Sequence, residues 1–130
     1  MKTLIVEDDF TCRLLLQTLL SEYGDCHVAV NGHEAVEAVR AAAAASPYDL
    51  ICMDILLPGM DGEEAVRRVR ALEEARGIPS RNGAKIVMTT SVSDIQKVMR
   101  CFDGLCDAYL VKPIETAELL GKLRSLQLLQ

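Results

Sequence analysis

The sequence has no apolar run that approaches the roughly 18 residues of a membrane-spanning helix, and no signal peptide precedes its first apolar segment. It has no cluster of Lys and Arg either, and its formal net charge of −5 argues against direct contact with nucleic acid. We therefore expect a cytoplasmic protein that inserts into no membrane and has no nucleic-acid partner.

The five cysteines show no metal-binding pattern. They lack any CxxC spacing, so a metal site built from thiolates is disfavoured. Cys12 and Cys52 lie within apolar patterns and are expected to be small core residues. The two histidines, His27 and His33, fall on a predicted edge strand and at a predicted helix start, where we expect them to be exposed and without a chemical role.

Length and composition indicate one globular domain. The chain has 130 residues, of which 50% are hydrophobic and 25% are charged, and it contains no internal repeat or low-complexity segment. Strand and helix patterns alternate five times along it. Short apolar segments predict strands at 4–6, 26–30, 50–53, 84–90 and 106–111.

A helix pattern follows each predicted strand. The first carries inward positions at Cys12, Leu15, Leu16, Leu19 and Tyr23 and ends at Gly24. The fourth spans 94–102, and the fifth starts at Glu115 or Thr116. This (βα)₅ pattern predicts an α/β fold with a parallel sheet between two helical layers. The mixed polarity of 26–30 places that strand at an edge, which favours the order 2-1-3-4-5.

The stretch from Tyr48 to Gly62 is the centre of this arrangement. Its apolar run 50–53 reads as a strand buried on both faces, and Asp54 follows directly. Pro58, Gly59 and Gly62 then form a turn-rich loop before the next helix. Asp54 is therefore expected at the carboxyl end of a core strand, which is where ligands bind in open α/β sheets.

Polar side chains follow three other strands at the same edge. Glu7 and Asp8 follow the first strand, Thr90 ends the fourth, and Lys112 follows the fifth. Glu7, Asp8 and Asp54 would converge there, and like charges so close together require a cation. Oxygen-only ligands with no nearby His or Cys favour Mg²⁺ or Mn²⁺. The set suits phosphoryl transfer onto a carboxylate, with a lysine and a hydroxyl beside it.

These segments also carry a family resemblance that spans nearly the whole chain. The matching residues are Ile5-Val6-Glu7-Asp8-Asp9, Met53-Asp54 with Pro58 and Met60-Asp61-Gly62, Thr89-Thr90-Ser91, and Tyr109-Leu110-Val111-Lys112-Pro113. The chain resembles the receiver domain of two-component response regulators in its single-domain, CheY-like form. The resemblance implies a flavodoxin-like fold and a single receiver domain over residues 1–130, with no output domain. It also implies no enzymatic activity beyond the domain's own phosphorylation and dephosphorylation.

The resemblance implies roles for the residues at the strand ends. Asp54 would accept a phosphoryl group from a sensor histidine kinase or a phosphotransfer protein. Glu7, Asp8, Asp54 and the backbone carbonyl of Leu56 would hold Mg²⁺, and Lys112 would contact the phosphoryl group.

The same resemblance implies a switch that reaches the surface. Thr90 would bind the phosphoryl group, and Tyr109 would change rotamer when Thr90 moves. The surface of helix four, strand five and helix five would then bind a downstream protein, with the chain a monomer or a phosphorylation-dependent dimer. The family often has a cis bond before the proline that matches Pro113. In many of its members a glycine directly follows helix four, whereas here Gly104 is followed by Leu105, so this turn departs from the family pattern.

Other interpretations of these residues stay open. Residues 7–9 could instead be an ordinary acidic cluster at the start of a helix. Tyr109 could serve only to pack the core beside its strand. The chain could act as an interaction module that is never phosphorylated. A phosphatase of the haloacid dehalogenase type is disfavoured, because such enzymes carry a second aspartate two residues after the nucleophile and this chain has Leu56 there. A dinucleotide-binding domain is disfavoured as well, because no G-x-G-x-x-G follows the first strand.

Overall fold

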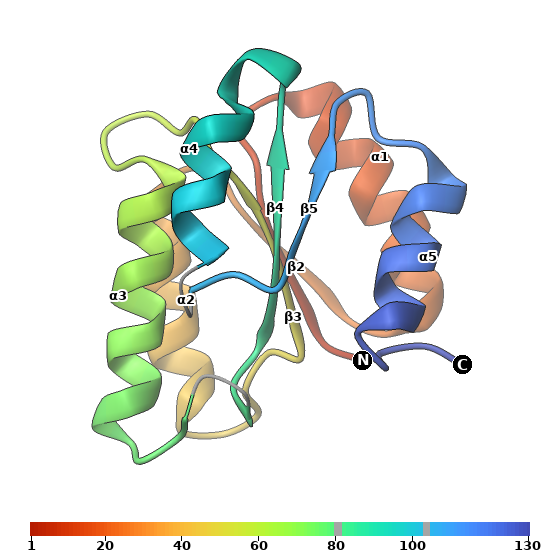
Figure 1. Cartoon of the computed structure of the whole chain (residues 1–130). Coiled ribbons are helices and arrows are strands. Elements are labelled where there is room, and N and C mark those ends of the chain that lie inside the picture. The colour runs from red at the N-terminus through yellow and green to blue at the C-terminus, as the bar shows by residue number, and fades with distance from the viewer. Residues whose placement is uncertain (80–81, 103–104) are drawn as a thin grey trace.

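The structure is a computed structural model that describes residues 1–79, 82–102 and 105–130 (Figure 1). Its sheet has the order β2-β1-β3-β4-β5, and every neighbouring pair is parallel. The predicted strand order and fold class are therefore confirmed. The strands are β1 Thr3–Val6, β2 Cys26–Ala29, β3 Leu50–Asp54, β4 Lys85–Thr90 and β5 Ala108–Val111.

Helices cover both faces of this sheet. On one side lie α1 and α5, and on the other α2, α3 and α4 (Figure 1). The helices are α1 Phe10–Leu20, α2 Gly32–Ala43, α3 Gly62–Ala75, α4 Ile95–Met99 and α5 Thr116–Ser125. Short 3₁₀ turns among the described residues include η1 Ser21–Tyr23, η3 Val92–Asp94 and η4 Arg100–Phe102.

The first three helices begin with the same capping device. The side chain of the residue before each helix accepts a hydrogen bond from a backbone N–H in the first turn: Asp9 from Cys12, Asn31 from Glu34 and Asp61 from Glu64. Each bond satisfies a donor that the helix cannot pair internally. Asp9 and Asp61 therefore fix where α1 and α3 start, after the loops that follow β1 and β3.

Two apolar clusters separate the layers. The core beneath α2, α3 and α4 contains Met53 and Met88, whereas the core beneath α1 and α5 contains Ile5 and Leu119. Alternate residues of each central strand thus face opposite clusters, which is why these strands read as continuous apolar runs. Cys52 is buried as predicted, and Cys12 is half-buried.

Two local predictions were wrong. Leu15 is 38% exposed, because Leu16 and Leu20 form the buried stripe of α1 and Leu15 lies about 100° round the helix from Leu16. The predicted helix over 94–102 is divided into η3, α4 and η4. Apolar spacing does not distinguish 3₁₀ from α hydrogen bonding. The side chain of Phe102 and the turn at Gly104 lie outside the described part of the chain.

In the described ranges, no helix is both long and apolar enough to cross a membrane. His27 and His33 are exposed, as expected, and the His27 ring has a hydrogen-bond partner. Its Nδ1 lies 2.7 Å from the hydroxyl of Tyr48, which is buried beneath the edge strand.

Candidate functional site

Neighbouring strands bring the three predicted carboxylates together. Val6 of β1 pairs with Met53 of β3, so the residues that follow, Glu7 and Asp54, end up side by side. Ligand oxygens of Glu7, Asp8 and Asp54 all lie within 4.8 Å of one another. Glu7 is fully buried, Asp54 is 5% exposed, and Asp8 is open to solvent. The convergence expected from the strand ends is present in the structure.

Lys112 reaches this cluster from the end of β5. Its Nζ donates hydrogen bonds to Asp54 Oδ2 at 3.0 Å and to Glu7 Oε1 at 3.1 Å. Burial alone would lower the pKa of Lys112, but the bonds to the two carboxylates outweigh it and raise the pKa. The lysine is therefore firmly cationic. Its bond to Pro113 is cis, as the resemblance implied.

Glu7 is the carboxylate of the cluster whose charged form is disfavoured by its surroundings. Burial raises its pKa, the hydrogen bond from Lys112 partly offsets that rise, and the charge of Asp54 adds to it. Its Oε2 lies 2.9 Å from Lys112 Nζ, yet among the described residues this buried atom has no partner in hydrogen-bond geometry. A buried, unsatisfied carboxylate oxygen carries a free-energy penalty that a further positive charge would relieve.

The donor set fits a hard divalent cation. The three clustered side chains offer only carboxylate oxygens, which are the ligands that Mg²⁺ and Mn²⁺ prefer. The unsatisfied Glu7 Oε2 is a ready ligand atom, and exposed Asp8 leaves a route from solvent. Among the described residues, Lys112 is the one cation that forms ion pairs with the carboxylates of the cluster, so three carboxylates share one paired lysine.

The loop after β3 holds Asp54 in place. The backbone N–H of Leu56 donates to Asp54 Oδ1 at 3.1 Å, so one oxygen faces Leu56 while the other faces Lys112. Gly62 closes the loop by donating to the Ile55 carbonyl at 2.9 Å. A Cβ at Gly62 would lie 2.3 Å from the Asp54 carbonyl oxygen, so only glycine allows this close return.

These groups line an open pocket of about 280 Å³. Ser91, which belongs to the family resemblance, lines this pocket, and so does Asp94, which was not predicted from the sequence. Asp94 lies four residues beyond the end of β4, in the η3 turn, and the position of such a residue depends on the path of the turn. A count of charged residues in every loop at this edge would have found it. The lining comprises Glu7, Asp8, Asp9, Asp54, Ile55, Leu56, Ser91, Asp94 and Lys112.

The two predicted switch residues lie apart from this lining. Thr90 is buried, and its hydroxyl donates to the Ser91 carbonyl at 2.9 Å. Tyr109 is half-buried in a groove between β5 and α5, where Lys122 Nζ lies 6.0 Å from its ring centroid. Both residues occupy the strands where they were expected, and the hydroxyl of Thr90 is engaged locally.

A doubly wound α/β fold with a carboxylate cluster and a lysine at its switch point defines a class of domains that bind ligands at the carboxyl ends of their strands. The family described as "Response regulator receiver domain" matches residues 3–124. The chain belongs to this family, and it is a receiver domain of two-component phosphorelay signalling.

Relatives of the chain occur in both kinases and regulators. It is 38% identical over 125 residues to hybrid signal transduction histidine kinase B of Dictyostelium discoideum, a match that covers 92% of this chain and 6% of the kinase. The chain spans about half or less of the length of the curated relatives it matches first.

Two solved structures are similar over their whole receiver domains. One is the receiver domain of Ssk1 in complex with the histidine phosphotransfer protein Ypd1 from Saccharomyces cerevisiae, with a TM-score of 0.82, 29% identity and coverage of 99% of this chain and 92% of that one. The other is the receiver domain of sensor histidine kinase PA1611 from Pseudomonas aeruginosa, with magnesium coordinated in its active-site cleft. Its TM-score is 0.76, its identity 28%, and the match covers 97% of both chains.

Proposed function

We propose that Asp54 accepts a phosphoryl group from the phosphohistidine of a sensor histidine kinase or phosphotransfer protein. The observation that carries this proposal is the convergence of Glu7, Asp8 and Asp54 with Lys112 bonded directly to the Asp54 carboxylate. A buried carboxylate with a lysine bonded to it is placed to act as a nucleophile toward phosphorus. The Ypd1 complex of a similar receiver domain supports a phosphotransfer protein as the donor class.

The transfer is a displacement at phosphorus. An Asp54 oxygen forms a bond to phosphorus while the bond from phosphorus to the histidine nitrogen breaks, and the imidazole leaves with the bonding electrons. Lys112 Nζ, 3.0 Å from Asp54 Oδ2, lies where it can balance charge on the phosphoryl oxygens. Mg²⁺ held by Glu7, Asp8, Asp54 and the Leu56 carbonyl would supply further positive charge there.

Phosphorylation adds negative charge beside Thr90, which is the proposed internal sensor. The Thr90 hydroxyl now donates to the Ser91 carbonyl, and turning it toward the phosphoryl group would break that bond and open space beside β5. Tyr109 would then turn inward. The surface of α4, β5 and α5 would change in shape, and a downstream protein would recognise that change as the signal.

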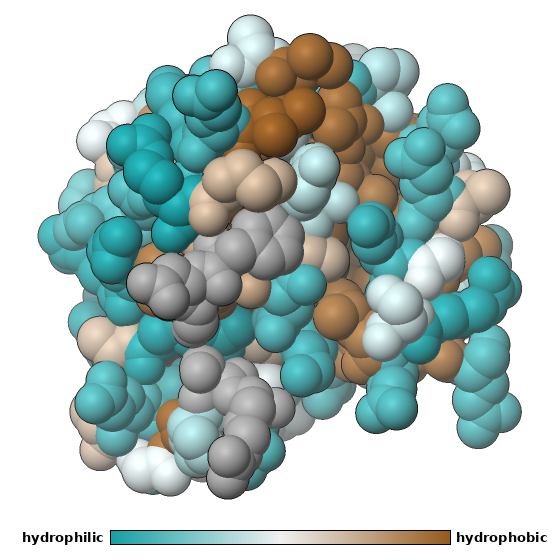
Figure 2. All heavy atoms as spheres, viewed as in Figure 1, coloured by the Kyte–Doolittle hydropathy of each residue, from teal (hydrophilic) through white to brown (hydrophobic). Residues whose placement is uncertain are grey.

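An apolar rim around the pocket supports protein docking at this edge. Hydrophobic atoms gather at the end of the molecule above β4 and β5 (Figure 2). Phe10, Leu56 and Val92 follow the carboxyl ends of β1, β3 and β4 and are exposed. Exposed apolar residues beside a charged centre favour a protein over a small molecule as the phosphoryl donor. Five free cysteines fit a cytoplasmic setting, where the chain would act as a monomer or a phosphorylation-dependent dimer.

Labelling with acetyl phosphate and Mg²⁺ tests the proposal. The unmodified chain should gain the mass of one phosphoryl group, and Asp54→Asn should gain none, because an amide is a poor nucleophile. Asp61→Asn is the matched control, since Asp61 caps α3 outside the pocket lining and Asn also caps helices. A chain that is never labelled would instead be an unphosphorylated interaction module, and continuous phosphate release from phosphomonoesters would indicate a phosphatase.

A further inference from the structure

Two pocket carboxylates have no part in the proposed phosphoryl transfer: Asp9, which caps α1, and Asp94. The side chain of Asp94 is 16% exposed and lines the same pocket as Asp54 and Lys112. Asp94 Oδ2 accepts a hydrogen bond from the Ser91 hydroxyl at 2.9 Å, and Oδ1 lies 3.5 Å from Lys97 Nζ. Although it precedes α4, its side chain caps no backbone N–H of that helix. The Ser91 hydroxyl is therefore its one hydrogen-bond donor among the described residues.

Ser91 links this carboxylate to the phosphoryl pocket. It follows Thr90 directly, it lines the pocket itself, and its carbonyl accepts both the Thr90 hydroxyl and the backbone N–H of Asp94. The Ser91 hydroxyl also lies 3.0 Å from that of Ser93. Hydroxyls at the end of β4 are thus bonded within the β4–α4 turn and are not directed at Asp54.

A phosphoryl group on Asp54 would bring three strongly accepting oxygens into this pocket. Lys112 is the one cation among the described lining residues, so the new oxygens must find other donors. A charged phosphoryl oxygen and a charged carboxylate are acceptors of similar strength. Resting on the function proposed above, we propose that Asp94 and the phosphoryl group compete for the hydroxyl of Ser91.

This competition would couple phosphorylation to the turn before α4. When Ser91 donates to the phosphoryl group, Asp94 loses its hydrogen-bond donor and faces added negative charge in the same pocket. The η3 turn, Val92–Asp94, is then held by fewer bonds, and it leads straight into α4 through Ile95. Asp94 is thus a positioning residue that stabilises the unphosphorylated arrangement of the β4–α4 turn.

A double-mutant cycle with beryllofluoride tests the competition. The probe is beryllofluoride with Mg²⁺, titrated into the unmodified chain, Asp94→Ala, Ser91→Ala and the double variant. Bound probe is measured by its ¹⁹F resonance, and the amide resonances of 92–94 report the turn. Asp94→Ala should tighten binding about fivefold through lost competition and lost repulsion, and Ser91→Ala should weaken binding severalfold.

The cycle separates competition from simple charge repulsion. If the two residues compete, Asp94→Ala gains clearly less affinity in the Ser91→Ala background, because no hydroxyl remains to be released. Equal gains in both backgrounds, or no loss on Ser91→Ala, would overturn the inference. Absence of any bound resonance in the unmodified chain would count instead against the function proposed for Asp54. Ser91 is exposed and Asp94 is half-buried, so folding should survive both substitutions, which melting curves verify.

Discussion

Arg70 is a charged residue that α3 holds 8% exposed, far from the acidic pocket. Its guanidinium donates to Glu73 at 2.8 Å and to Asp107 at 3.1 Å. It also donates to the Leu105 and Ala84 carbonyls, both at 2.8 Å. Glu73 and Asp107 in turn accept backbone N–H groups near the start of β4. One arginine therefore joins α3 to the amino ends of β4 and β5.

Arg70→Ala should lower the free energy of unfolding by about 3 kcal/mol, because it leaves two partly buried carboxylates and two carbonyls without their donor. Urea unfolding measures the change. Arg68→Ala on the same helix is the control, since Arg68 pairs with Glu64 on the surface and should cost roughly 0.5 kcal/mol or less. Similar losses for both variants would show that the Arg70 network contributes no more than a surface ion pair.

Glu7 contributes a pH dependence to the stability of the metal-free protein. Burial raises its pKa above the ordinary 4.5, so over that interval the folded state keeps a proton that the unfolded chain has released. Its contribution to stability is full below the unfolded value and is lost as the pH rises through the raised pKa. With chelator present, the free energy of unfolding should therefore fall over this range as the pH is raised.

The double substitution Glu7→Gln with Asp8→Asn should remove much of this fall in the free energy of unfolding with rising pH. Without metal at neutral pH, the double variant should be more stable by roughly 1 kcal/mol, or about 3–5 °C in Tm. It should also bind Mg²⁺ at least about a hundredfold more weakly, since even residues that merely support metal ligands contribute ten- to a hundredfold. Melting curves with and without Mg²⁺ measure both effects. A double variant less stable than its parent in chelator would mean that the carboxylates do not repel one another.

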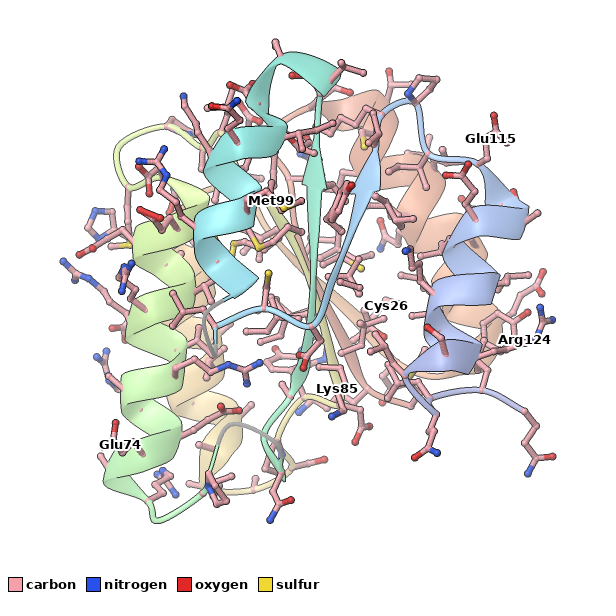
Figure 3. The ribbon with its side chains drawn as sticks, viewed as in Figure 1. Cys26, Glu74, Lys85, Met99, Glu115 and Arg124 are labelled. Atoms are coloured by element: carbon pink, nitrogen blue, oxygen red, sulfur yellow. The ribbon has the colours of Figure 1, made fainter. Side chains whose placement is uncertain are left out.

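Among the elements, the β4–α4 segment departs furthest from the pattern predicted from sequence. Apolar spacing indicated one helix, but the chain makes η3, α4 and η4 in succession. Ser91 and Asp94 close the first turn through side-chain and backbone bonds, and the Cys101 carbonyl accepts two N–H groups at the far end. Met99, labelled on α4 in Figure 3, is exposed on this segment. Short turns of this kind rearrange at little cost, as a signalling surface requires.

Thr90→Ala tests the internal switch between the pocket and β5. The variant should still bind beryllofluoride with Mg²⁺, because Asp54 and Lys112 are unchanged. The response of the Tyr109 ring resonances to beryllofluoride should largely disappear, since no hydroxyl is left to be drawn inward. Thr90→Ser, which keeps the hydroxyl, should restore the response. A full Tyr109 response in the alanine variant would place the coupling in another element.

The loops after β3 and β4 should set the lifetime of the phosphorylated form. Leu56 is 48% exposed and lines the pocket, and Val92 is 72% exposed in the neighbouring turn. Neither side chain can hold a water in line with the phosphorus–oxygen bond, so we expect slow hydrolysis. Leu56→Asn with Val92→Glu should speed phosphate release roughly tenfold, equivalent to about 1.4 kcal/mol in the barrier.

Phosphate release after the donor is removed provides the measurement. Leu14→Asn is the control, because Leu14 is an exposed apolar residue on α1 outside the pocket lining. Release from that variant should match the parent. A double variant no faster than the parent would show that apolar side chains at the pocket mouth do not limit hydrolysis.

At the scale of the whole molecule, the acidic pocket and the hydrogen bonds of Arg70 lie at opposite ends of the sheet. The acidic pocket occupies the carboxyl ends of β1, β3 and β4, and the Arg70 network holds the amino ends of β4 and β5. Lys85, labelled in Figure 3, marks that amino end on β4. Because the Arg70 hydrogen bonds hold the amino ends of the strands, we expect the loops at the carboxyl ends to rearrange without loosening the core.

The sequence predicted the family, the strand order and the convergence of Glu7, Asp8 and Asp54, because strand periodicity and strand-end polarity are local signals. Asp54 and Glu7 could be paired from topology alone, since parallel strands end at one edge. The partners of Arg70 could not be predicted in this way, because Asp107 lies 37 residues away and its contact with Arg70 depends on how α3 packs against the sheet. The direction of the Thr90 hydroxyl and the presence of Asp94 in the pocket likewise depend on the path of the β4–α4 turn.

Chemical mapping of the phosphorylated residue tests the central claim most directly. The chain is phosphorylated with acetyl phosphate and Mg²⁺ and then reduced with borohydride, which converts an aspartyl phosphate to homoserine. Peptide mass mapping then locates the modified position. We expect homoserine in place of Asp54 alone, and none when Mg²⁺ is chelated. Homoserine at Asp8, Asp9 or Asp94, or labelling that does not depend on the metal, would contradict the assignment of Asp54 as the metal-dependent phosphoryl acceptor.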